Sequence, residues 1–135
     1  MKAQELMIGD WVLYNGKFVS VNCIASGFVG LERPVLKDVI CKDKTIEPIP
    51  LTPEILEKNG FKETDVVVVG TRKMRWESED TRTEITIWMD DTMPMEIRKN
   101  IYYEDEVCYT LPCPWAVHQL QHALRLCGID KEIAI

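Results

Sequence analysis

The hydrophobic pattern of the first fifty or so residues predicts short strands separated by tight turns. Apolar-rich runs at residues 11–14 and 18–24 flank Asn15 and Gly16, a pair that is typical of a two-residue hairpin turn. Shorter runs follow at 28–31, 39–41 and 45–47, and a turn at Ser26 and Gly27 precedes the first of them. Four or five short strands in so short a segment predict a small β-barrel.

A cluster of prolines predicts a boundary after this barrel. Pro48, Pro50 and Pro53 fall within residues 46–53. Proline fixes φ and has no backbone N–H, so an extended connection is expected here rather than a helix or a central strand. We therefore divide the chain into two lobes, residues 1–48 for the barrel and residues 49–135 for the remainder.

A short helix is expected directly after the prolines. Thr52 is suited to cap it, Pro53 to occupy its first position, and Gly60 to end it. In the Schellman type of helix ending, Phe61 would then contact Leu56.

Alternating apolar and polar residues predict an antiparallel sheet in the middle of the chain. Four valines at 66–69 suit a strand buried on both sides, and the strand is expected to continue at 71–76 after Gly70. Residues 83–89 place Ile85, Ile87 and Met89 on one face, and further strands are expected at 95–98 and 107–109. The connections are too short for parallel crossovers, which favours a meander.

The last segment predicts an amphipathic helix of about fourteen residues, from Pro114 to the residue before Gly128. Its apolar stripe follows spacings of three and four and consists of Val117, Leu120, Leu124 and Cys127. The predicted fold class is therefore α+β, with a small barrel, a short helix, an antiparallel β-meander and a C-terminal helix packed on the sheet.

The other side of this helix is neither polar nor fully apolar. It carries Trp115, His118, His122 and Leu126. A second face of this kind is a candidate partner surface, for the barrel, for a second copy of the chain or for another protein. Burial of this face under the barrel is an equally good interpretation.

Charge and cysteine content narrow the functional classes. The chain has 22 acidic and 16 basic residues, a net charge of −6 that disfavours binding to duplex DNA. The five cysteines are odd in number and form no C-x-x-C motif, so reduced thiols in a bacterial cytoplasm are expected. We expect no membrane association, because no segment is long and apolar enough to span a bilayer and the N-terminus lacks a secretory signal.

A metal site is the sharpest chemical hypothesis that the sequence offers. His118 and His122 are four residues apart, on one helical face, and Cys113 precedes them, with Cys108 as a possible fourth ligand. A zinc hydrolase of the H-E-x-x-H type needs a glutamate directly after the first histidine, and Gln119 occupies that position. We expect no metal, no cofactor and no catalytic residues, and a metal-dependent enzyme ranks third among the candidate functions.

Nucleic-acid binding through the barrel or the sheet is the second-ranked function. Arg72, Arg75 and Trp76 alternate basic and aromatic side chains along one predicted strand, and Trp88 lies on the next. A flat sheet face with exposed aromatic rings can stack bases. The acidic net charge and the lack of a continuous basic stripe disfavour it.

Three segments carry a family resemblance: E-L-M-I-G-D-W-V at residues 5–12, I-E-P-I-P-L-T-P-E-I-L-E-K-N-G-F at 46–61 and V-H-Q-L-Q at 117–121. They resemble a family of small uncharacterised proteins of gut bacteria, commonly encoded by prophages and mobile elements. The resemblance implies an N-terminal SH3-like barrel, a linker helix, an antiparallel sheet and a closing helix. The family has no assigned activity, and its members more often have Asn at the position of His122, which further weakens the metal hypothesis.

Together these observations predict a non-catalytic binding or adaptor protein of phage or mobile-element origin. Its expected partner is a protein, with self-association into a homo-oligomer as one form of this, and nucleic acid is the less favoured partner.

Overall fold

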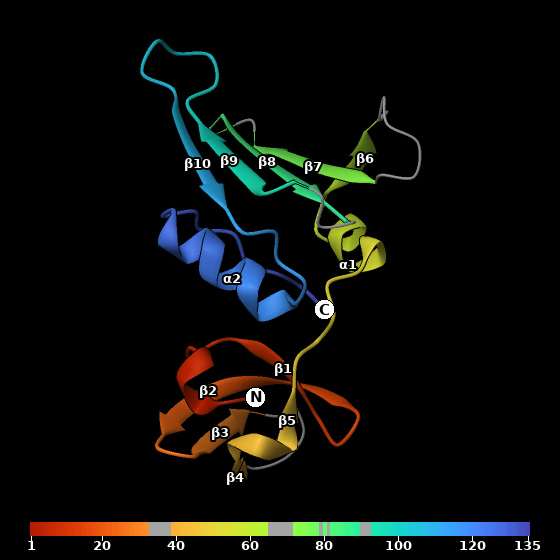
Figure 1. Cartoon of the computed structure of the whole chain (residues 1–135), viewed down its shortest axis with the longest axis vertical. Helices are drawn as coiled ribbons and strands as arrows, with labels where there is room; N and C mark the ends of the chain where they lie inside the picture. The colour runs from red at the N-terminus through yellow and green to blue at the C-terminus, as the bar shows by residue number, and fades with distance from the viewer. Residues whose placement is uncertain (33–38, 65–71, 79, 81, 90–92) are drawn as a thin grey trace.

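The computed structural model of the chain is an α+β fold with two antiparallel sheets and two α-helices in the part that it describes (Figure 1). That part comprises residues 1–32, 39–64, 72–78, 80, 82–89 and 93–135. Within these ranges, neither helix combines the length and the apolar character needed to cross a membrane. The predicted valine strand at 66–69 lies outside the described residues, as do Asp90 and Asp91 between the predicted strands at 83–89 and 95–98.

The first sheet is formed by the N-terminal third of the chain and curls into a half-barrel. Its strands are β1 (Trp11–Tyr14), β2 (Lys17–Ala25), β3 (Phe28–Glu32), β4 (Val39–Lys42) and β5 (Ile46–Glu47), in the order β4-β3-β2-β1-β5. The predicted hairpin turn is confirmed, because Asn15 and Gly16 have φ angles of 49° and 71° between the paired residues Tyr14 and Lys17. A short 3₁₀ helix, η1 (Ala3–Glu5), precedes the sheet.

One predicted strand begins later than expected. Thr45 ends a second 3₁₀ helix, η2 (Asp43–Thr45), instead of opening the last strand. Its hydroxyl donates a hydrogen bond to the carbonyl of Lys42 at 2.7 Å, a local bond that competes with strand pairing.

The linker helix α1 (Pro53–Lys58) has the boundaries that its caps predict. The Thr52 hydroxyl accepts a hydrogen bond from the N–H of Ile55 at 3.3 Å. Gly60 has a φ of 86°, and the N–H of Phe61 donates to the carbonyl of Leu56 at 3.0 Å. The predicted Schellman ending is therefore confirmed.

The second sheet is the predicted meander. Its strands are β6 (Lys62–Thr64), β7 (Lys73–Ser78), β8 (Thr83–Trp88), β9 (Met95–Lys99) and β10 (Val107–Leu111), in the order β10-β9-β8-β7-β6. Every described neighbour pair is antiparallel. Strand β6 was not predicted, because its three polar or charged residues show no apolar alternation.

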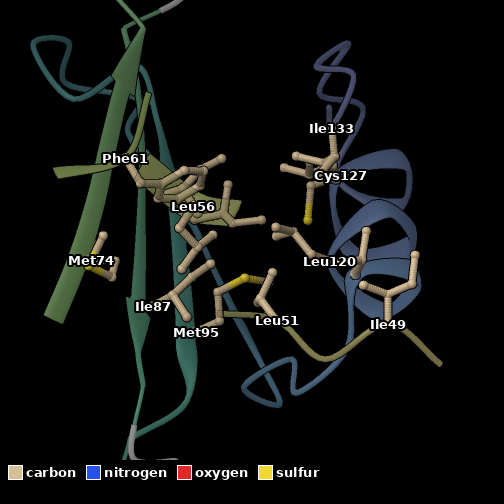
Figure 2. Packing of buried hydrophobic residues seen from close by; sticks show 14 residues of the cluster. Ile49, Leu51, Leu56, Phe61, Met74, Ile87, Met95, Leu120, Cys127 and Ile133 are labelled. Carbon is tan, nitrogen blue, oxygen red and sulfur yellow. The ribbon is translucent and has the colours of Figure 1, made fainter. Parts of the chain in front are cut away.

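Two buried apolar clusters lie on either side of the proline-rich linker. The first cluster fills the half-barrel with residues from Ala3 to Ile46. The second contains residues from Ile49 to Ile133 and includes the inner face of the second sheet and the apolar stripe of helix α2 (Val117–Leu126). Figure 2 shows Leu120 and Cys127 pointing from this helix toward Ile87 and Met95 of the sheet. Trp11 and Leu13 of β1 also pack against the second cluster.

Helix α2 starts at Val117, three residues later than predicted, although it ends as predicted before Gly128. Trp115 and Ala116 stay outside the helix because the backbone there pairs with the linker. The N–H of Leu51 donates to the carbonyl of Trp115, and the N–H of Val117 donates to the carbonyl of Ile49, both at 2.9 Å. This bridge holds Ala116 extended, with φ −131° and ψ 153°, so the helix cannot begin at Pro114.

Candidate functional site

The predicted partner face of α2 divides into two surfaces in the structure. His118 is buried and His122 is half-buried, both on the side that meets the N-terminal segment. Trp115 and Leu126 remain 60% and 78% exposed. The two histidines are therefore wholly or partly covered, whereas the two large apolar residues are open to solvent.

A buried aspartate occupies the centre of the covered surface. Asp10 has no exposed side-chain area, and its Oδ2 lies 2.6 Å from Nε2 of His122 while its Oδ1 accepts from Nη1 of Arg125 at 2.8 Å. The N–H of Met7 also donates to Oδ2 at 2.7 Å. A buried carboxylate is tolerated only when its oxygens are bonded in this way.

Gln121, on the same side of the helix, forms hydrogen bonds with the backbone of the residues directly before and after Asp10. Its Oε1 accepts from the N–H of Trp11 at 3.0 Å, and its Nε2 donates to the carbonyl of Gly9 at 3.1 Å. Gly9 has a φ of 90°, and a Cβ there would lie 3.1 Å from Nη2 of Arg125, so both conformation and close approach favour glycine. The bonds that join residues 9–11 to Gln121, His122 and Arg125 are called the Asp10 contact below.

Three aromatic side chains contact one another in a row along the start of α2, beside the Asp10 contact. Trp115 and His118 meet edge to face at 6.4 Å between ring centroids, and His118 and His122 do so at 5.7 Å. Burial lowers the pKa of His118; the negative charge of Asp10 opposes this shift, His122 adds to it, and Glu5 opposes it. The buried Nδ1 of His118 has no hydrogen-bond partner among the described residues. His118 is therefore neutral in the folded protein at pH 7.

This burial predicts a loss of stability in mild acid. Burial holds the pKa of His118 in the folded state below its ordinary 6.5. The contribution of the neutral ring to stability is therefore complete above pH 6.5. It is lost as the pH falls from 6.5 through the lower pKa of the folded state, because the unfolded chain takes up the proton first. Urea unfolding from about pH 8 to about pH 5 should show the free energy of unfolding of wild type falling more steeply than that of His118→Gln. Equal slopes in the two proteins would contradict it.

The residues of the metal hypothesis form other contacts or lie apart from one another. His122 bonds Asp10, the thiol of Cys113 donates to the carbonyl of Trp88 at 3.0 Å, and Cys108 lies exposed on β10. Gln119 accepts from the N–H of Trp115 at 2.9 Å and so caps the helix start. Within the described ranges, no group of three or more His, Cys, Asp and Glu side chains is placed to hold a metal ion.

The candidate nucleic-acid residues do not share one face. Arg75 and Trp76 are neighbours on β7, so they point to opposite sides of the sheet, and Trp76 pairs in register with the buried Ile85. Trp76 packs against the second core, whereas Trp88 lies opposite Lys73 on the outer side.

Both arginines of that prediction are already paired with carboxylates. Arg75 bonds Glu84 at 2.8 Å and Glu77 at 3.3 Å, and Arg72 bonds Glu63 at 2.9 Å. A phosphate backbone would have to displace these partners to reach the guanidinium groups.

The open surface of α2 is an apolar groove of about 680 Å³. Its apolar lining comes from three parts of the chain and includes Met7, Leu111, Pro112, Trp115, Ala123 and Leu126. His122 and Arg125 reach its edge from the Asp10 contact. The same packing of α2 against the N-terminal segment buries Asp10 and forms the groove, because the carboxylate of Asp10 also accepts from the N–H of Met7.

The groove is the candidate functional site. Sequence spacing identified Trp115 and Leu126, but Met7 and Leu111 are distant in sequence and only the fold brings them to this surface. Comparisons with family models, with curated proteins and with solved structures give no match for this chain.

Proposed function

We propose that this chain is a non-catalytic binding or adaptor protein whose partner, a protein, docks on the groove beside α2. The observation that carries the proposal is the exposure of Trp115 and Leu126 together in one apolar hollow. Contiguous exposed apolar surface costs free energy in water, and tryptophan is enriched among residues that dominate binding energy.

A structural role for the polar groups at the groove supports the non-catalytic part of the proposal. His122 and Arg125 both bind the carboxylate of Asp10, which has no exposed side-chain area. These bonds have a structural role, because they satisfy a buried carboxylate and fix the orientation of His122 on the helix.

We also propose that the half-barrel is an SH3-like barrel and that the protein acts in a bacterial cytoplasm as the product of a phage or mobile element. The strand order and the short 3₁₀ helix between β4 and β5 support the first part. The five free cysteines fit a reducing compartment. The resemblance of the three sequence segments supports the phage or mobile-element origin.

The groove is tested by capture from an extract of the bacterium that encodes the chain. Immobilised wild type and the double variant Trp115→Ala, Leu126→Ala are compared, and bound proteins are identified by mass spectrometry. We expect at least one protein to bind the wild type and to bind the variant about tenfold or more weakly, since loss of an aromatic anchor of this kind costs about 2 kcal/mol or more.

The matched control removes equally exposed apolar groups from the half-barrel. Phe28 and Ile40 are 46% and 76% exposed on β3 and β4. The double variant Phe28→Ala, Ile40→Ala should capture the same protein as wild type. If both double variants capture the protein equally weakly, or if both capture it as well as wild type does, the groove is not the binding site.

A further inference from the structure

Strand β10 is an edge strand without the usual protection against pairing with another chain. The two sheets have four edges in the described residues, and three of them carry charged residues: Lys42 on β4, Glu47 on β5, and Lys62 with Glu63 on β6. Strand β10 reads V-C-Y-T-L and has neither a charge nor a proline. Lysine, proline and short length are the devices that prevent edge-to-edge association.

The side chains of β10 are also exposed on the side of the sheet that faces α2. Tyr109 lies opposite the buried Ile97, which places Tyr109 and Val107 on the inner side, yet they are 39% and 41% exposed. The strand ends at Leu111, which lines the groove. The open edge and the groove therefore form one continuous apolar surface.

We propose that a second copy of this chain is the partner at this surface, and that the two β10 strands pair antiparallel about a twofold axis near Tyr109. The proposal rests on the proposed function and names the partner of the same site. The pairing would join the two second sheets into one sheet with both α2 helices on the same side. The grooves of the two copies would then meet beside the axis.

Self-complementarity favours a second copy over an unrelated peptide. A twofold axis at Tyr109 places Val107 opposite the second copy's Leu111, so apolar residues meet each other and no like charges are opposed. Glu106 bonds Arg98 of its own chain at 2.6 Å. Glu104 and Asp105 also precede β10, and antiparallel pairing directs them toward the groove of the second copy. Arg125 borders that groove with a side chain that is 38% exposed beside its bond to Asp10. These charges have opposite signs.

The size of the contact sets its expected strength. Stable interfaces bury about 1,200 Å² of surface or more in total, and a pair of five-residue strands alone would not reach that. The contact needs Trp115 and Leu126 in addition to the strands. We therefore expect a dissociation constant in the range of about 1–100 µM.

The first experiment measures mass by analytical ultracentrifugation over about 5–500 µM chain. Wild type should shift from monomer to dimer, whereas Tyr109→Glu should remain monomeric because it places two carboxylates beside the axis. Nζ of Lys99 lies 6.0 Å from the Tyr109 ring, so the new carboxylate has a cation within the same chain and the fold should persist. Tyr103→Glu is the control, since it adds the same charge at a residue that is 56% exposed outside β10.

The second experiment does not depend on whether Tyr109→Glu folds. Cys108 is exposed on β10 and Cys23 is exposed on β2, so Cys23→Ser leaves Cys108 as the exposed thiol on a β-strand. A short bismaleimide should link Cys108 to the second copy's Cys108, as peptide mapping would show, because antiparallel pairing near Tyr109 brings these residues close.

The outcomes separate this proposal from the proposed function. A monomer at every concentration, a dimer that Tyr109→Glu leaves intact, or links that never involve Cys108 would overturn β10 pairing. Capture of another protein at the groove by such a monomer would still support the proposed function. A dimer with the expected properties that captures no other protein would support β10 pairing and contradict a role as an adaptor for other proteins.

Discussion

Asp10→Ala should lower the free energy of unfolding by about 2–4 kcal/mol, because it removes three hydrogen bonds to a buried charge. Arg125 and His122 would lose their shared partner, and the N–H of Met7 would lose its acceptor. The value lies at the lower end for a buried ion pair, since the Arg125 side chain is 38% exposed and can regain water. Urea unfolding followed by circular dichroism measures the change.

The control for this substitution is Asp105→Ala. Asp105 is an exposed residue in the turn before β10, and its loss should change stability by no more than about 0.5 kcal/mol. Equal losses in Asp10→Ala and Asp105→Ala would show that the Asp10 contact does not stabilise the fold. A double variant with Arg125→Ala should lose less than the sum of the two single changes, because both remove the same bond.

The Asp10 contact also links stability to the groove. Met7 lines the groove and its backbone donates to Asp10, so the contact fixes one wall of the proposed binding surface. The segment before the half-barrel thereby contributes to the groove together with α2. The loss of stability in Asp10→Ala should therefore be accompanied by weaker binding at the groove.

Elements with local signals were predictable from the sequence. The turn at Asn15 and Gly16 requires positive φ angles that these residues adopt readily, and the helix between Thr52 and Gly60 is defined by its own caps. The alternation in residues 83–89 identified the buried face of β8, including Ile85 and Ile87. In each case the determining contacts lie within a few residues of one another.

Elements that depend on distant partners were not predictable in the same way. The start of α2 moved to Val117 because the linker residues Ile49 and Leu51 pair with the segment before it. Strand β6 has no apolar pattern of its own and exists through its pairing with β7. Periodicity describes a segment alone, so it cannot reveal such pairings.

The candidate site was likewise predictable where local spacing defines it and not where distant residues do. Spacing on a helix placed Trp115, His118, His122 and Leu126 together, but it could not show which of them another element would cover. That depends on Asp10, whose side-chain partners His122 and Arg125 lie more than a hundred residues away in sequence.

The largest expected contrast within one helix is between Leu120→Ala and Leu126→Ala. Leu120 is fully buried and points into the second core (Figure 2), so its truncation removes buried methyl groups and leaves a cavity. We expect a loss of about 2–5 kcal/mol in the free energy of unfolding. Leu126 is 78% exposed, and its truncation should cost no more than about 0.5 kcal/mol.

For association of the two copies, Leu126→Ala should have the larger effect and Leu120→Ala the smaller one. Leu126→Ala keeps the fold but removes part of the groove, so the dimer measured by ultracentrifugation should weaken about tenfold, with the melting temperature nearly unchanged. Leu120→Ala should lower the melting temperature while the folded fraction still associates at low temperature, because Leu120 does not line the groove. Equal losses of stability in the two variants would mean that the helix presents a different face to the core, and both the core and the groove would have to be reassigned.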